Sequence, residues 1–93
     1  MGILPIDFSD LDKGIRDIVV LFNENGVETF ESCQGGKGHA FFEPTIRFHG
    51  ECHEGYRVFA LARANRLRIS AIRRVWDCED GELVGPCWEA TFY

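Results

Sequence analysis

The chain has 93 residues and a formal net charge of −5 at pH 7. This length favours a single domain, and the negative charge opposes general nucleic-acid binding, because phosphate contacts need clustered Lys and Arg. The sequence holds no run of the roughly 20 apolar residues that cross a bilayer, and its start lacks the basic residues and cleavage site of a secretory signal. We therefore expect a cytoplasmic protein with no membrane partner.

The first half of the chain predicts one helix and two strands. Apolar residues recur at helical spacing over residues 10–25, and Asn25-Gly26 supplies the left-handed residue that favours a helix end. Ser9 and Asp12 resemble a capping box before it. Residues 27–33 and 45–49 alternate as strands do, with Ile46 and Phe48 on one side of the second strand. The helical stripe consists of Leu11, Ile15, Ile18, Val19 and Phe22.

The second half repeats the same order. Residues 54–65 predict an amphipathic helix, residues 68–77 a strand, Asp80-Gly81 a turn and residues 86–93 a last strand, with Trp88, Ala90 and Phe92 on one side. The apolar positions of this helix are Tyr56, Phe59, Ala60, Ala64 and Leu67. The order α-β-β-α-β-β predicts one α+β domain over residues 1–93. We expect two layers: a four-stranded antiparallel sheet with both helices on one face.

The aromatic and cysteine contents bear on assembly and redox state. Eight Phe, two Trp and two Tyr are many for a domain of this length to cover by itself, so we expect a homodimer. Without a secretory signal, the four cysteines are expected to be reduced thiols. Two of them, Cys78 and Cys87, flank the Asp80-Gly81 turn and could pair under oxidising conditions.

The glycine-rich segment between the first two strands is the main candidate site. Glycines let backbone N–H groups turn toward a ligand, and a lysine beside them adds positive charge, which suits an anion such as phosphate. The segment has neither the spacing of a P-loop nor that of a dinucleotide fingerprint, and a plain connecting loop is the alternative. Its residues are Ser32, Cys33, Gln34, Gly35, Gly36, Lys37, Gly38 and His39.

Arginine and aromatic residues could complete such a site. Six of the ten basic residues are arginines between positions 57 and 74, which permits a local anion site on an acidic protein, although such a run can also simply face water. We expect Arg47 and Arg74 to meet ligand charge and Phe42 to stack on a base. Other rings that could stack are Phe41, Tyr56, Trp76 and Trp88.

Two further alternatives are a zinc site, built from the four cysteines and three histidines of the chain, and a thiol enzyme. Zinc binding is disfavoured, because no Cys-x-x-Cys or His-x₃-His pair is present and Cys52 and His53 are adjacent. A thiol enzyme would use Cys33 as nucleophile and His39 or His49 as base, but no third orienting group is evident. We expect no cofactor and no metal.

The segment Glu31-Ser32-Cys33-Gln34-Gly35-Gly36, followed by residues 44–48, resembles a family of small uncharacterised bacteriophage and prophage proteins. This resemblance implies a viral protein in the host cytoplasm that sequesters a nucleotide signal of host defence or occupies a host protein's basic surface. A shorter segment is similar to the Ser-Cys-Ser-Gly motif of the tRNA wybutosine-synthesising protein 3 family, which are methyltransferases. Only Ser32, Cys33 and Gly35 match, so methyl transfer and tRNA binding are not carried over.

The sequence therefore favours a non-enzymatic module that binds a small anionic, nucleotide-derived ligand. The first alternative is an acidic inhibitor that binds a host protein directly through its Asp and Glu surface. The second alternative is an enzyme that depends on Cys33 and His39.

Overall fold

The structure is a computed structural model that describes residues 11–38, 41 and 43–93. The elements follow in the expected order, α-β-β-α-β-β, and the α+β class is confirmed. Ser9 of the expected capping box lies outside the described residues. The bounds are α1 (Leu11–Glu24), β1 (Glu28–Cys33), β2 (Thr45–His49), α2 (Cys52–Ala64), β3 (Ile69–Glu79) and β4 (Glu82–Phe92).

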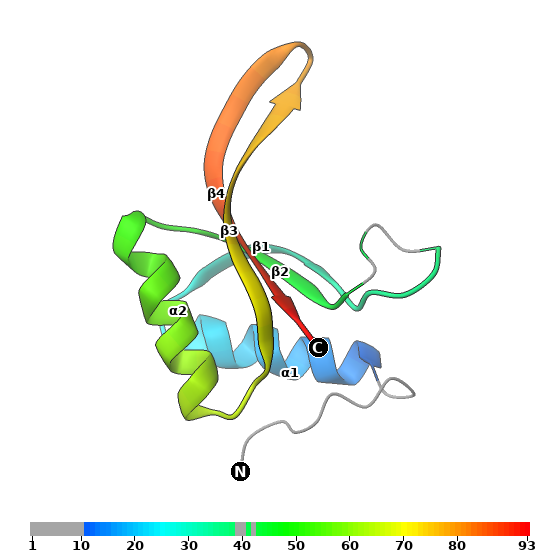
Figure 1. Cartoon of the computed structure of the whole chain (residues 1–93), viewed down its shortest axis with the longest axis vertical. Helices are drawn as coiled ribbons and strands as arrows, with labels where there is room; N and C mark the ends of the chain where they lie inside the picture. The colour runs from blue at the N-terminus through cyan, green and yellow to red at the C-terminus, as the bar shows by residue number, and fades with distance from the viewer. Residues whose placement is uncertain (1–10, 39–40, 42) are drawn as a thin grey trace.

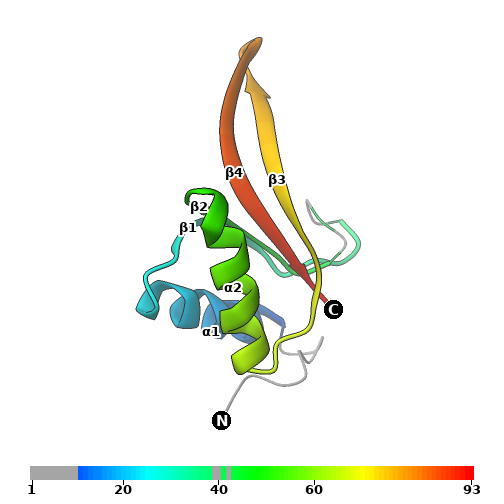
Figure 2. The same cartoon turned by 60° about the vertical axis from the view of Figure 1, so that its left-hand side comes forward.

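The four strands form one antiparallel sheet in the order β1-β2-β4-β3 (Figure 1). Both helices cover the same face of this sheet, as expected (Figure 2). Each α-β-β half contributes one edge strand and one central strand, and the two central strands pair with each other. The outer strands β1 and β3 therefore leave their far edges unpaired within the described sheet.

The core lies between the helices and the sheet. From α1 it receives Ile15, Ile18 and Phe22, and from β2 it receives Ile46 and Phe48. These residues confirm the expected stripe of the first helix, apart from Leu11, whose side chain lies outside the described part, and they confirm the alternation of β2. The remaining members of the core are Val27, Val58, Ala62, Leu67, Ala90 and Phe92.

The expected apolar stripe of the second helix is wrong except at Leu67, which is buried in the core. The sequence places Tyr56 and Phe59 on the buried side, but their exposed fractions are 82% and 47%. The buried residues of α2 are instead Glu54, Gly55, Val58 and Ala62. The reason is the large ring of Trp88 beneath the helix: a Cβ at Gly55 would lie 2.7 Å from its Cη2. The ring leaves no room for a side chain at position 55, so a glycine faces the sheet there, while Tyr56 and Phe59 face outward.

The β3–β4 hairpin extends beyond the rest of the sheet (Figures 1 and 2). Each of its strands has eleven residues whereas β2 has five, so the outer half of the hairpin pairs only with itself. The turn at Asp80-Gly81 is confirmed, and β4 begins four residues before the expected position. Cys78 lies opposite Leu83 and Cys87 opposite Val75, and both thiols are free.

Candidate functional site

The glycine segment forms the start of the connection between β1 and β2. Gly35, Gly36 and Gly38 have φ values of +83°, +107° and +87°, a region that favours glycine. The buried Gly35 donates its N–H to Sγ of Cys33 at 3.4 Å, so this amide is directed at sulfur. Lys37 is exposed. Ser32 and Cys33 are the last two residues of β1, and half-buried Gln34 follows them. His39 and Phe42 lie outside the described residues.

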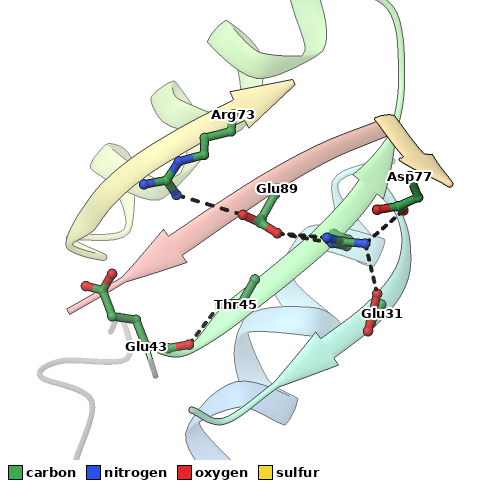
Figure 3. A network of polar contacts seen from close by, with 7 residues as sticks. Glu31, Glu43, Thr45, Arg73, Asp77 and Glu89 are labelled. Atoms are coloured by element: carbon green, nitrogen blue, oxygen red, sulfur yellow. Dashed lines mark hydrogen bonds and ion pairs between the residues drawn. The ribbon is translucent and has the colours of Figure 1, made fainter. Parts of the chain in front are cut away.

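Arg47 is the centre of an ion-pair network on the face of the sheet away from the helices (Figure 3). Its side chain is 16% exposed. Nη1 lies 3.0 Å from Oδ2 of Asp77 and 3.6 Å from Oε1 of Glu31, and Nη2 lies 3.1 Å from Oε1 of Glu89. Arg73 approaches the other oxygen of Glu89 at 3.8 Å. The guanidinium thus connects carboxylates from the three other strands and is already neutralised.

The pKa of Arg47 reflects this environment. Burial opposes its charge, but the hydrogen bond with Glu89 and the charges of Asp77, Glu89 and Glu31 outweigh burial and raise its pKa above the ordinary value. Arg47 therefore serves to hold the sheet together, and its charge is not free for an anionic ligand.

Arg74 lies on the opposite face of the sheet from Arg47. The register pairs Arg73 with Glu89 and Arg74 with Trp88, and Trp88 pairs with the buried Phe48. Successive residues of a strand point to opposite faces, so Arg74 shares the helix-covered face with Trp88. The structure therefore does not bring Arg74 together with Arg47.

Arg74 is fixed by two contacts. Its Nη1 donates to the carbonyl of Gly50 at 2.7 Å, and its guanidinium carbon lies 4.7 Å from the ring centroid of Trp88. The indole is itself held, because Nε1 donates to the carbonyls of Gly50 and Glu51. A cation over an indole face is favourable, so the guanidinium is held in place before any ligand arrives.

A groove runs between α2 and β3 and has two compartments. The first, of about 440 Å³, is lined by Gly55, Tyr56, Phe59, Ile69, Ser70, Ala71, Ile72 and Trp88. We call it the Trp88 compartment. The second, of about 310 Å³, is lined by Phe59, Ala62, Arg63, Arg66, Leu67, Arg68, Ile69 and Tyr93. We call it the Tyr93 compartment. Phe59 and Ile69 line both, so the compartments adjoin and form one groove.

Three arginines line the Tyr93 compartment, and a fourth, Arg74, contacts the lining residue Trp88; none of the four is neutralised by a carboxylate that the structure describes. Within residues 11–38, 41 and 43–93, no ion pair joins Arg63, Arg66, Arg68 or Arg74 to a carboxylate. Arg68 instead lies 5.9 Å from the ring centroid of Tyr93. On a protein with a net charge of −5, the groove is a local concentration of uncompensated positive charge beside exposed rings.

Arg66 occupies a position where glycine is usual. Helix α2 ends at Ala64, and the N–H groups of Arg66 and Leu67 donate to the carbonyls of Arg63 and Ala62. This is a Schellman motif, in which the left-handed residue is most often glycine. Arg66 has a φ of +57°, which costs about 1 kcal/mol or more for a residue with a side chain. The helix end thus keeps a cation where a glycine would be more stable.

Tyr56, Trp88 and Arg74 were predicted from the sequence as candidates, and Arg63, Arg66 and Arg68 belong to the arginine cluster noted there. The residues of the groove that were not predicted as part of a site include Phe59 and Tyr93. A signal was present: positions 56, 59, 63 and 66 recur at the spacing that places residues on one helix face. From the sequence, the apolar members of this stripe were expected in the core. They were therefore not considered together with the arginines of the same stripe.

The described residues do not bring together the side chains that the thiol enzyme or the zinc site would need. Cys33 lies opposite Thr45, and His49 lies opposite Glu28 at the other end of the strand pair. His49 stacks on Phe30, with ring centroids 4.3 Å apart, and so cannot act as the base for Cys33. Among the residues that the structure describes, no three His, Cys, Asp or Glu side chains gather as a metal site.

Comparison with protein-family models, with curated proteins and with solved structures found no match. The resemblances stated from the sequence therefore stay predictions, and function must be argued from the geometry. No helix in the described ranges is long and apolar enough to cross a membrane.

Proposed function

We propose that this protein is a non-enzymatic binding module for a small anionic ligand that contains a planar ring, most simply a nucleotide. We place the ligand in the α2–β3 groove. The observation that carries the proposal is the set of four arginines without carboxylate partners among the described residues, beside the exposed rings of Tyr56, Phe59 and Tyr93.

The chemistry of the groove suits a phosphate and a base. Arginine binds phosphate through two parallel N–H donors, and the contacts with Trp88 and Gly50 hold Arg74 in place, which reduces the entropy lost on binding. Aromatic side chains stack on any base, and Tyr56, which is 82% exposed, is accessible for this. Each compartment has a volume within the range of known ligand sites.

The glycine segment is the weaker location for the same ligand. Of its expected partners, Arg47 is neutralised by three carboxylates and Arg74 lies on the other face of the sheet. Lys37 remains as a cation of the segment itself. We therefore move the proposed site from this segment to the groove and keep the proposed class of ligand.

The resemblance to phage proteins suggests a purpose for such a module. A protein that binds a nucleotide without converting it lowers the free concentration of that nucleotide in proportion to its own amount. We propose that the ligand is a nucleotide signal of host defence, held in the cytoplasm of the infected cell.

The first experiment is native mass spectrometry of the protein purified from cells, followed by calorimetric titration with AMP, GMP, CMP and UMP. We expect a retained anionic small molecule and measurable binding of at least one monophosphate. Because each charge-assisted hydrogen bond contributes about 1.5–3 kcal/mol, the double variant Arg66→Gly/Arg74→Gln should bind at least about tenfold more weakly.

Two matched controls locate the site. Arg16→Gln removes an exposed arginine from α1, and Gly36→Val alters the glycine segment at a φ of +107°. Both should bind as the wild type does. Loss of binding in Gly36→Val with normal binding in the double variant would return the site to the glycine segment. A wild type that carries no ligand and binds none of the nucleotides would refute the proposal.

The β3–β4 hairpin favours the alternative of a protein partner. Its outer half exposes Trp76 and Leu83, 53% and 67%, next to Glu79, Asp80 and Glu82. An apolar strip with acidic neighbours suits a basic partner surface, and a second copy in a homodimer could use the same strip. If this is the main function, Trp76→Ser/Leu83→Ser should abolish capture of the partner, high salt should weaken it, and the groove variants should not affect it.

A further inference from the structure

The α2–β3 groove repeats the same pair of features along its length. The Trp88 compartment contains the exposed ring of Tyr56 and is bordered by Arg74, which stacks on Trp88. The Tyr93 compartment contains the exposed ring of Tyr93 together with Arg68 and two further arginines. A single ring-plus-phosphate ligand would satisfy one compartment and leave the other with exposed rings and unpaired charge.

The distance between the two cationic ends can be estimated from the strand. Arg68 immediately precedes β3 and Arg74 lies within it, and six residues of strand span roughly 20 Å. Arg68 lines the Tyr93 compartment, whereas the guanidinium of Arg74 lies over the ring of Trp88 at the border of the other compartment. Phe59 lines both compartments, so an apolar contact is continuous between them.

We infer that the groove binds a dinucleotide: two nucleotide units joined through phosphate, one in each compartment. This inference rests on the proposed function and names its ligand. Charge complementarity selects the occupant, because three unpaired arginines line the Tyr93 compartment and Arg74 lies against Trp88, a lining residue of the other compartment. The net charge of −5 on the whole protein opposes a long strand that would continue beyond the groove.

Arg66 provides an independent variant for the test. Because Arg66 has a φ of +57° at a helix end that favours glycine, Arg66→Gly should leave the melting temperature unchanged or raise it. A fall in affinity in this variant cannot then be ascribed to loss of the fold. Arg74→Gln serves as the matching variant in the Trp88 compartment, with circular dichroism to confirm that it is folded.

The experiment is isothermal titration calorimetry with a length series of 5′-phosphorylated adenylates: AMP, pApA and pApApA. We expect two AMP per chain but one pApA per chain. Joining two units gives the second an effective concentration near millimolar, which raises affinity by about 10²–10⁴-fold, so pApA should bind at least about 100-fold more tightly than AMP. The trinucleotide should bind within about threefold of pApA, because two compartments hold two units.

The variants test the assignment of the compartments. Arg66→Gly and Arg74→Gln should each weaken one of the two AMP sites by about tenfold or more and should each remove most of the advantage of pApA. Arg16→Gln should change neither. If one variant leaves the affinity for pApA unchanged, the two-compartment inference is wrong.

Three further outcomes would overturn the inference, and they separate it from the proposed function. If AMP binds and pApA gains nothing, the ligand is a mononucleotide and the proposed function stands. If affinity still rises steeply from pApA to pApApA, the groove binds a strand. If none of the three binds and Arg66→Gly converts a dimer to a monomer in analytical ultracentrifugation, a second copy covers the groove and the proposed function fails as well.

Discussion

The substitution Arg47→Met should destabilise the protein by about 3 kcal/mol, because it removes the nearer partner of Glu89 and leaves the more distant Arg73. Glu89 is 9% exposed, and removing one partner of a buried ion pair costs about 3–5 kcal/mol. Arg73 lies 3.8 Å from Glu89 but is 57% exposed, so it recovers no more than about 1 kcal/mol. Asp77 and Glu31 are 42% and 46% exposed, and losing these contacts adds at most about 1 kcal/mol each.

Urea denaturation followed by tryptophan fluorescence measures this loss. A slope of about 1–3 kcal/mol per molar urea converts 3 kcal/mol into a midpoint lower by about 1–3 M. Methionine keeps most of the aliphatic stem of Arg47, so the packing changes little. The double variant Arg47→Met/Glu89→Leu should recover most of the stability, since an apolar pair can replace a buried ion pair at little or no cost.

The single variant and the double variant together test the role of the network. A loss below about 1 kcal/mol, or a double variant no more stable than Arg47→Met, would show that the network does not hold the sheet together.

Two smaller predictions concern α2. Gly55→Ala should destabilise the protein by about 1–3 kcal/mol through overpacking against Trp88 and should shift the fluorescence of this tryptophan. Helix propensity alone predicts the opposite, a stabilisation by up to about 1 kcal/mol. The sign of the change in unfolding free energy, measured by denaturation, decides between the two. Hydrogen bonds from Arg57 lower the pKa of Glu54 below its ordinary 4.5. The stability that this carboxylate contributes is therefore present at higher pH and is lost as the pH falls through its folded-state pKa. The difference in unfolding free energy between wild type and Glu54→Gln should shrink below pH 4.5, and a constant difference would contradict the pairing.

The proposed site shows the limit of reasoning from the sequence. The glycines at 35, 36 and 38 have the left-handed φ values that their residue type predicts, yet the arginine expected beside them is neutralised by Glu31, Asp77 and Glu89. Those carboxylates lie up to 42 residues away in the chain. Whether a cation is free to bind a ligand depends on such distant partners. The spacing of residues within one segment does not identify them.

The sequence by itself determined the order of the elements, the inward face of α1 and the alternation of β2, because each depends on a periodicity shared by neighbouring residues. Only the tertiary structure decided which side of α2 is buried and which arginines are unpaired. The ring of Trp88, supplied by a strand more than thirty residues later, leaves no room for a side chain at Gly55. For this steric reason the side of α2 that carries Gly55 packs on the sheet, and Tyr56 and Phe59 line a groove on the surface.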